Sequence, residues 1–200
     1  MTILNRPLYP ALLLLLALLS VGAVSAPVTY NIDPDHTHPL FETDHYGLSV
    51  WRGLFKNTTG TISLDAAAAT GTVDVQIDMT SVDFGLDKLN EVAVNSSAPP
   101  ILEATKYPLA HYKGTLTNFK NGVPTAVVGD LTMHGVTRPV TLRIDSFKCL
   151  EHHPVSNKAV CGADASATFN RADFGITVGQ RYGFKMDVNL HIQVEAIRAD

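Results

Sequence analysis

Residues 129–144 read GDLTMHGVTRPVTLRI, and this stretch indicates the fold class of the chain. Apolar and polar residues alternate on both sides of the pair His134-Gly135. The apolar set is Val127, Gly129, Leu131 and Met133 before the pair and Val140, Leu142 and Ile144 after it. Alternation puts the two sets on opposite faces of a strand, and glycine accepts the positive φ of a tight reversal. The stretch therefore predicts a β-hairpin whose apolar face must be covered by more sheet, a helix or a ligand. Pro139 cannot donate to a ladder, so we expect it at a strand entrance or an edge.

The same alternation recurs in nine segments of the chain, the central hairpin among them, and predicts a sheet of about eight or nine strands. They cover residues 29–32, 41–45, 48–56, 59–64, 72–79, 109–119, 127–144, 162–170 and 184–196, the last being the most regular. Polar residues on every second position favour antiparallel sheets over buried parallel ones. An antiparallel chain of this length closes as a barrel or stacks as a sandwich. An eight-stranded barrel is wide enough for one elongated apolar ligand.

One segment has helical spacing instead. Residues 86–94 have room for two helical turns, with Leu86, Leu89 and Val92 or Ala93 on one side. Pro99-Pro100 ends this segment because proline cannot continue a helix. We expect an all-β domain with one short helix.

The N-terminus has the pattern of a secretory signal peptide. Arg6 precedes an apolar run over residues 11–19, and small residues follow as far as Ala26. The run is too short to span a bilayer comfortably. We predict a signal peptide over residues 1–26, with cleavage after Ala23 left open, and a single domain over residues 27–200 in the periplasm.

The charge balance argues against nucleic-acid binding. The formal net charge is −4 and no basic patch stands out, whereas proteins that bind phosphate backbones gather Lys and Arg on one face. We expect no nucleic-acid partner.

The two cysteines, Cys149 and Cys161, remain in the exported part of the chain. Disulfides persist outside the cytosol, so we predict a Cys149–Cys161 bridge. The alternative is a four-ligand zinc site formed with His152 and His153.

Several segments, in order along the chain, match the pattern of one known family. They are Asp33 to Thr37 for D-x-x-H-S/T, Phe41 to His45 for F-x-x-x-H, Gly53-Leu54-Phe55 for G-x-F, residues 75–83 for a strand ending in S-V-D, Lys106-Tyr107-Pro108 for K-Y-P, residues 129–142 for G-D-L-T-x-x-G-V-T-K/R-P-V-x-L, and residues 170–176 for x-R-x-D-F-G-I/L. These segments resemble the YceI family of periplasmic polyisoprenoid-binding proteins. The likeness covers nearly all of the chain after the leader.

This resemblance implies a lipocalin-like, extended antiparallel β-barrel whose lumen holds a long isoprenoid tail. It also implies a binding or carrier protein, not an enzyme, with the lipid, polyprenyl or quinone-like, as its ligand and no other cofactor. We expect the ligand to contact His36, near the barrel entrance, together with Phe41, His45, Phe55, Leu131, Met133, Phe174, Phe184, Met186 and Val188. For Phe174, Phe184 and Met186 the sequence leaves plain core and lumen wall open.

Two departures from the family pattern concern the ligand. Residues 89–104 replace a D-x-H-L run and paired Phe, and Thr43 stands where an aliphatic residue is usual. The first departure points to an altered barrel mouth.

Several polar residues are compatible with a different function. His36 and His38 have a spacing that suits metal chelation, so an extracytoplasmic metal- or haem-handling protein is one alternative function. Ser81 near Asp83 is a weak candidate pair for a small barrel enzyme. Arg171 and Asp173 are expected to form an ion pair that braces a turn. A homodimer and a transient contact with a membrane, or with a membrane redox protein, are left open.

Overall fold

The computed structural model describes residues 26–95 and 101–200. The predicted signal peptide, apart from Ala26, and the pair Pro99-Pro100 lie outside these ranges. No helix within them is long and apolar enough to cross a bilayer.

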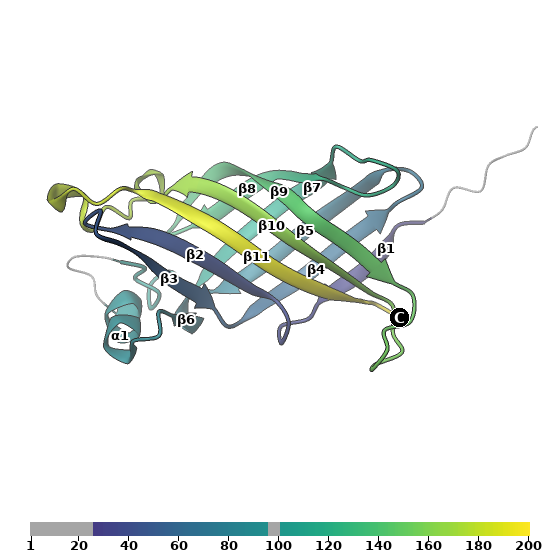
Figure 1. Ribbon diagram of the computed structural model, residues 1–200, viewed down its shortest axis with the longest axis horizontal. Coiled ribbons are helices and arrows are strands. Elements are labelled where there is room, and N and C mark those ends of the chain that lie inside the picture. Colours follow the sequence, from purple (N-terminus) through teal and green to yellow (C-terminus); the bar gives the residue numbers. More distant parts are fainter. Residues whose placement is uncertain (1–25, 96–100) are drawn as a thin grey trace, which may run out of the picture.

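The described chain is built mainly of strands (Figure 1). The strands are β1 (Val28–Ile32), β2 (His38–His45), β3 (Ser49–Phe55), β4 (Thr58–Asp65), β5 (Thr70–Asp78), β6 (Val82–Asp83), β7 (Leu109–Thr117), β8 (Ala126–Met133), β9 (Val136–Leu150), β10 (Val160–Asn170) and β11 (Asp187–Arg198). The helices are α1 (Asp87–Asn95) and three 3₁₀ turns, η1 (Met79–Ser81), η2 (Arg171–Phe174) and η3 (Gln180–Tyr182).

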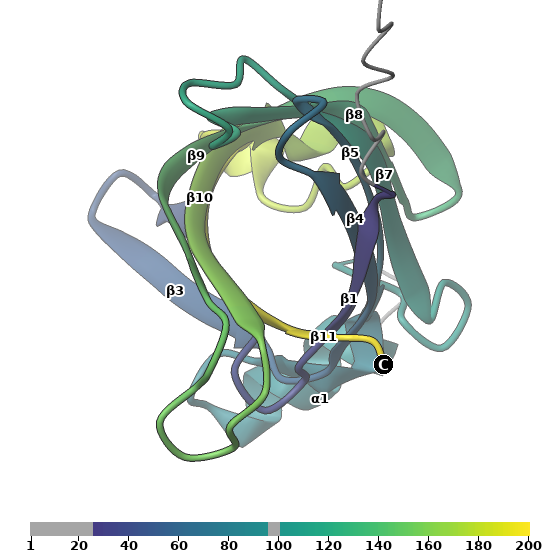
Figure 2. The same cartoon turned by 90° about the vertical axis from the view of Figure 1, so that its right-hand side faces the viewer.

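Eight of the strands close into an antiparallel barrel. Neighbouring strands pair in the order β1-β4-β5-β7-β8-β9-β10-β11, and β11 pairs with β1 to complete the ring. Figure 2 shows this ring from the end that carries the C-terminus. The predicted antiparallel, lipocalin-like barrel of about eight strands with one short α-helix is confirmed.

The other three strands extend one side of the barrel. β2 follows β1 along the same edge of β11, so the two act as one strand interrupted by the turn at residues 33–37. β3 pairs with β2, and the short β6 pairs with β3. This side flap and α1 lie at the left end in Figure 1.

The central hairpin is formed as predicted. β8 and β9 are joined by the two-residue turn His134-Gly135, with φ of 53° and 75°. These angles suit the right-handed twist of the two strands. Pro139 lies opposite Asp130 of β8, in the part of β9 that precedes its pairing with β10 at Arg143. Proline is therefore tolerated because only one neighbour pairs there.

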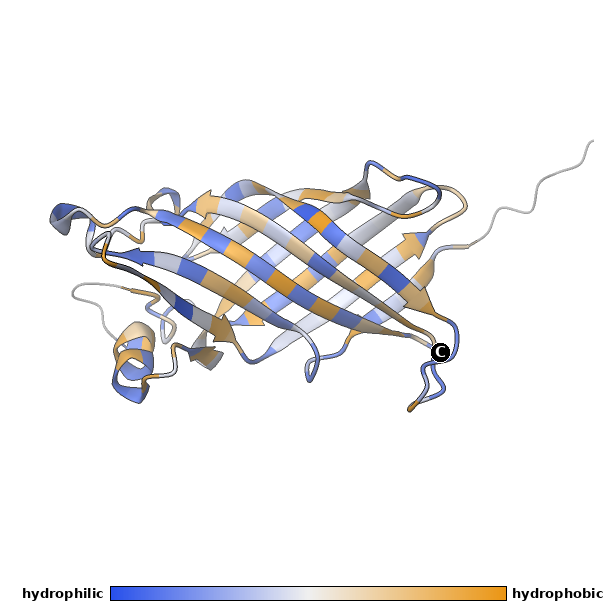
Figure 3. Ribbon diagram, in the orientation of Figure 1, coloured by the Kyte–Doolittle hydropathy of each residue, from blue (hydrophilic) through white to orange (hydrophobic). Residues whose placement is uncertain are grey.

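Apolar residues alternate with polar ones along the barrel strands (Figure 3). The buried set includes Val127, Leu131 and Met133 of β8 and Val140 of β9, on the face that the alternation predicted. Gly60, with φ of 142°, marks the close approach of β4 to β5, because a Cβ there would collide with the carbonyl oxygen of Asp74.

The last strand begins later than predicted. The alternation suggested a strand from Phe184, but β11 starts at Asp187. Gly179 and Gly183, with φ of 83° and 85°, flank η3 and reverse the chain instead. Phe184 and Met186 therefore belong to the loop that precedes the strand.

The helix α1 packs against β6 beside the barrel, at the left end in Figure 1. Ala93 is fully buried, while Leu86 and Val92 are exposed. The predicted helical face was thus partly wrong: Leu89 and Ala93, four residues apart, face the protein, and Leu86 precedes the helix.

Candidate functional site

The barrel interior contains an apolar cavity of about 180 Å³, here called the inner cavity. Its wall comes from the inward faces of β4, β5, β7, β8, β9, β10 and β11. The residues that line it are almost all aliphatic or aromatic, and none of these described residues is charged.

A second cavity of about 180 Å³, the mouth cavity, lies at the end of the barrel where α1 packs. Leu89 of α1 and the following residues Ile101 and Leu102 line one side of it. Arg171, Ile176, Val178 and Phe184, from the segment between β10 and β11, line another. The stretch in which the sequence departs from the family pattern thus contributes directly to the mouth, whereas a mouth altered relative to other family members stays a prediction.

The two cavities meet inside the barrel. Phe55, Met133, Phe169 and Leu190 line both of them. These four side chains form a waist between the two cavities. The lumen therefore holds two adjoining apolar cavities along its length.

Aromatic side chains form a continuous wall from the outer rim to this waist. The ring of Trp51 packs on Phe84, with 6.4 Å between centroids, and Phe84 packs edge-on against Phe41 at 5.3 Å. Phe41 in turn lies 5.4 Å from Phe55. Aromatic rings supply large apolar area with few rotatable bonds, so this wall is rigid and apolar.

Three hydroxyls are the polar side-chain groups among the described residues that line the inner cavity. Thr37 Oγ1 donates to Glu195 O and accepts from Glu195 N, both at 3.1 Å. Tyr112 Oη donates to Val140 O at 2.8 Å, and burial raises the pKa of this phenol. Thr58 is 1% exposed, and its Oγ1 has no partner within the described chain. A buried hydroxyl without a hydrogen-bond partner is costly. Thr58 Oγ1 is thus the one of these three hydroxyls that is free to contact a ligand.

Arg171 is the cation at the mouth cavity and is only 7% exposed. Its Nη1 donates to Ile176 O at 3.3 Å and its Nη2 to Val178 O at 2.7 Å. The buried Nε has no partner among the described residues. Burial lowers the pKa of the guanidinium, whereas the nearby carboxylate of Asp44 opposes that effect.

The predicted ion pair between Arg171 and Asp173 is wrong. Asp173 is exposed, and the guanidinium turns inward to the carbonyl groups of the η2–η3 segment. Arg171 does brace this turn, but through backbone oxygens, because its planar fork offers several N–H donors at fixed angles.

The structure brings together most of the residues predicted to contact a ligand. Phe41, Phe55, Met133, Phe184 and Val188 line the mouth cavity, and Phe55, Leu131 and Met133 line the inner one. These six side chains come from β2, β3, β8, β11 and the loop before β11. Their convergence on one lumen fits the prediction, while their contact with a ligand remains a prediction.

Three more of the predicted residues lie behind the lumen wall. Phe174 is 1% exposed, packs edge-on against Phe169 at 5.4 Å and lines neither cavity. Met186 is buried outside both linings, with its carbonyl accepting from Arg171 N at 2.9 Å. His45 stacks on Trp51 with 4.2 Å between ring centroids, so it supports the mouth from outside.

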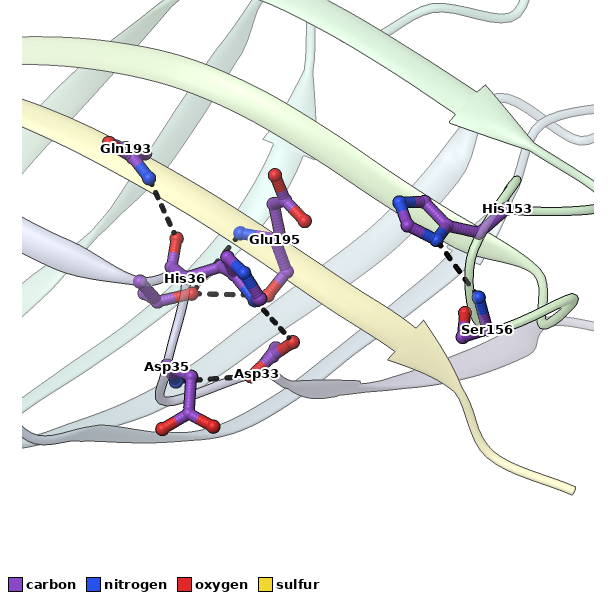
Figure 4. A network of polar contacts seen from close by, with 8 residues as sticks. Asp33, Asp35, His36, His153, Ser156, Gln193 and Glu195 are labelled. Carbon is purple, nitrogen blue, oxygen red and sulfur yellow. Dashed lines mark hydrogen bonds and ion pairs between the residues drawn. The ribbon is translucent and has the colours of Figure 1, made fainter.

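His36 is not near the barrel entrance, contrary to the prediction. It lies in the exposed β1–β2 turn, where Nδ1 and Asp33 Oδ2 are 2.8 Å apart (Figure 4). This hydrogen bond lowers the pKa of Asp33 and raises that of His36. The D-x-x-H motif thus closes the turn that interrupts the β1–β2 edge.

The cysteines form the predicted disulfide. Cys149 of β9 and Cys161 of β10 are directly opposite each other and are bonded. His153 Nδ1 accepts from the backbone N–H groups of Val155 and Ser156, which orders the β9–β10 loop. The thiolate ligands that a zinc site would need are therefore used in the bridge.

A metal-handling protein and a small barrel enzyme find little support in the geometry. Within residues 26–95 and 101–200, no three His, Cys, Asp or Glu side chains are grouped so as to hold a metal ion. Ser81 Oγ donates to Asp78 O and accepts from Asn57 N. Asp83 accepts from Gly85 N, Asn90 and Lys56. Both side chains thus serve turns.

Sequence reasoning missed several residues of the mouth. Trp51, Phe84, Leu89, Ile101, Leu102, Ile176 and Val178 all line it. Most come from loops or short elements, where neither strand nor helix periodicity shows which side chains face inward. The apolar character of residues 101–102 and 176–178, between polar turns, was the available signal.

Comparison with known proteins gives the family. A profile described as "YceI-like domain" matches residues 30–196. A UPF0312 protein of Pseudomonas putida is 30% identical over 187 residues, which cover 92% of this chain and 95% of that protein. A UPF0312 protein of Pseudomonas savastanoi is 32% identical over 169 residues, covering 83% and 85%.

Solved structures share the fold at lower identity. BcnA of Burkholderia cenocepacia has a TM-score of 0.63 and 19% identity, covering 82% of this chain and 99% of BcnA. A polyisoprenoid-binding domain of Saccharophagus degradans, implicated in plant cell wall breakdown, has a TM-score of 0.60 and 14% identity, covering 86% and 99%. The YceI protein of Campylobacter jejuni has a TM-score of 0.61 and 23% identity, covering 76% and 88%. The barrel, its lumen and the profile match over residues 30–196 together establish that the chain belongs to the YceI family.

Proposed function

We propose that this protein binds a long isoprenoid lipid, polyprenyl or quinone-like, in the barrel lumen and carries it in the periplasm. The observation that carries the proposal is the pair of adjoining apolar cavities inside the barrel. The leader pattern of residues 1–26 supports the location. The Saccharophagus degradans domain, named for polyisoprenoid binding, has the same fold, which makes an isoprenoid the first candidate among apolar ligands.

The lumen suits a tail that binds without charged anchors. Burial of apolar surface is non-directional and contributes about 0.8 kcal/mol for each CH₂ group removed from water. The inner cavity offers aliphatic and aromatic walls and no charged side chain among its described lining residues. Selection of the tail would therefore rest on its length and shape.

The polar end of the ligand would lie in the mouth cavity. Arg171 is buried there beside Thr43 and Asp44, and its Nε lacks a partner among the described residues. A cation in an apolar setting favours an oxygen acceptor, such as a quinone carbonyl or a phosphate oxygen. We infer that the head group lies next to Arg171 and the tail extends past Phe55 and Met133 into the barrel.

A pair of variants on one strand tests the proposal. Ala165 of β10 lines the inner cavity, whereas Thr168 on the same strand is exposed. Ala165→Phe adds a ring to the lumen and should exclude long isoprenoid quinones while still admitting short-tailed analogues. Thr168→Phe adds the same ring outside and should leave loading at the wild-type level.

The readout is the amount of quinone retained per protein after removal of unbound lipid, over a series of tail lengths. Equal retention of the long-tailed quinones by both variants would show that the ligand does not occupy the lumen. Failure of the wild-type protein to retain any member of the series would contradict the proposed ligand class.

A further inference from the structure

Two loops project beyond the lumen mouth and touch each other. They are residues 46–50, which lead from β2 into β3, and residues 180–185, which contain η3; together they are called the tip surface here (left end of Figure 1). The ring of Tyr46 packs edge-on against Phe184 with 4.3 Å between centroids. Lys185 N also donates to Asp44 Oδ2 at 3.1 Å. These contacts make the two loops one surface.

The outermost side chains of the tip surface are apolar and exposed. Leu48 is 85% exposed, Tyr182 56% and Tyr46 50%, and Val50 is exposed beside them. Single exposed apolar residues are common, but four on two touching loops indicate a site of interaction.

The residues of the tip surface carry charges of one sign, and the carboxylate of the adjoining Asp44 accepts from the backbone N–H groups of Gly47 and Lys185. Residues 46–50 and 180–185 include Arg181 and Lys185 and no Asp or Glu, in a chain whose net charge is −4. Both cations are exposed, and the guanidinium of Arg181 lies over the ring of Tyr182 with 4.6 Å to its centroid. The tip surface is thus complementary to a negatively charged partner, unlike the chain as a whole.

The tip surface is continuous with the lumen. Phe184 touches Tyr46 on the outside and also lines the mouth cavity. Trp51 lines the same cavity, and its stacking partner His45 packs edge-on against Phe184. A partner that covers the tips therefore lies at the entrance of the mouth cavity.

We propose that the tip surface inserts into the interface of an anionic lipid bilayer and presents the lumen mouth to it. Aliphatic apices, tyrosine rings and flanking cations are the arrangement that anchors proteins at the boundary between headgroups and acyl chains. This inference rests on the proposed function, since a lipid must move between membrane and lumen without crossing water.

A matched pair of variants tests it. Leu48→Asp places a charge at the apex of the tip surface. Val155→Asp places the same charge at an equally exposed position, 89% accessible, in the loop between β9 and β10 at the opposite end of the barrel. Both side chains are too exposed for the change to disturb folding.

The measurement is co-flotation with vesicles of phosphatidylethanolamine and phosphatidylglycerol. We expect wild-type protein and Val155→Asp to float equally, and Leu48→Asp to bind at least about tenfold more weakly, the lower bound for loss of one buried leucine. Raising the ionic strength should weaken the binding of the wild-type protein because its cations are exposed. Brominated lipid should quench the fluorescence of Trp51, the one tryptophan of the chain, equally in wild type and Val155→Asp and less in Leu48→Asp.

The lipid content of each variant separates this inference from the proposed function. Leu48→Asp should retain wild-type amounts of a preloaded isoprenoid quinone, because Leu48 lies outside both cavities. Vesicle binding that survives Leu48→Asp, or no binding of the wild type, overturns the inference whatever the lipid content. Empty wild-type protein contradicts the proposed function whatever the vesicle result.

Discussion

At the scale of single residues, Arg171 has two roles: it donates hydrogen bonds within the mouth, and it is the proposed contact of the ligand head group. Replacing it by Met removes the donors to Ile176 O and Val178 O. We expect the free energy of unfolding to fall by about 2 kcal/mol, because buried carbonyl groups lose their partners. Chemical denaturation measures this change.

The control for that experiment is Arg143→Met. The side chain of Arg143 is 76% exposed, and surface substitutions of this kind stay within about 0.5 kcal/mol. Equal losses in the two variants would show that the inward hydrogen bonds of Arg171 contribute nothing to stability.

Tyr112 gives a prediction about pH. Burial raises the pKa of its phenol above the ordinary value of 10.0. Above that value the unfolded chain loses the phenolic proton while the folded chain keeps it, so stability falls as the pH rises. Tyr112→Phe removes this group, and we expect the alkaline decline in unfolding free energy to be shallower than in the wild type. Parallel declines would mean that the phenol ionises equally in both states.

For two residues, the sequence did not predict where the side chain lies in the structure. His36 and Arg171 both belong to family motifs, and the sequence suggested a ligand contact for the first and an ion pair that braces a turn for the second. The structure places His36 in an exposed turn and Arg171 in the mouth cavity. A match to a motif identifies a residue but not the direction of its side chain. That direction depends on contacts with loops, and hydrophobic periodicity does not describe loops.

At the scale of elements, the β8–β9 turn holds residues 102–107, a segment at the mouth, in place. His134 Nε2 lies 2.7 Å from Glu103 Oε2, and its Nδ1 lies 3.0 Å from Phe174 O. His134→Asn keeps a residue that tolerates positive φ but shortens the side chain. We expect a loss of about 1–2 kcal/mol and faster amide hydrogen exchange at residues 102–107.

His191→Asn is the matched variant, since the His191 side chain is 58% exposed on β11. It should leave exchange at residues 102–107 unchanged. If both variants exchange alike, the contacts of His134 do not hold this segment in place.

The disulfide between Cys149 and Cys161 is expected to stabilise the folded protein. Cys149 and Cys161 are separated by 12 positions, and closing a loop of that size contributes about 3 kcal/mol in the chain-entropy model. The double variant Cys149→Ser, Cys161→Ser should lose that stability in thermal or chemical unfolding. Its retention of bound lipid should be unchanged, because Cys161 borders only a narrow cavity beyond the inner one. A double variant that loses bound lipid but keeps the unfolding free energy of the wild type would contradict both expectations.

The elements that the sequence predicted best are those with strict alternation. The β8–β9 hairpin has its predicted turn and its predicted inward face. The start of β11 was predicted three residues too early, because Phe184 and Met186 continue the alternation although Gly183 reverses the chain. Local backbone conformation overrode the pattern at that point.

At the scale of the whole molecule, alternation predicted a closed or stacked antiparallel sheet, and the family resemblance selected the barrel. The turn that interrupts the β1–β2 edge was predicted from the sequence, but the hydrogen bonds of Thr37 to both backbone groups of Glu195 had no sequence signal. The waist of the lumen was equally hidden, because Phe55, Met133, Phe169 and Leu190 meet there from four strands far apart in the chain.

Organic extraction followed by mass spectrometry shows whether this lumen holds an isoprenoid lipid. The protein should be exported in a bacterium and purified without detergent. We expect an isoprenoid quinone or polyprenyl compound in the extract, in an amount comparable with that of the protein. An extract that contains no isoprenoid, from protein whose lumen is shown to be empty or filled by another class of molecule, would contradict this expectation.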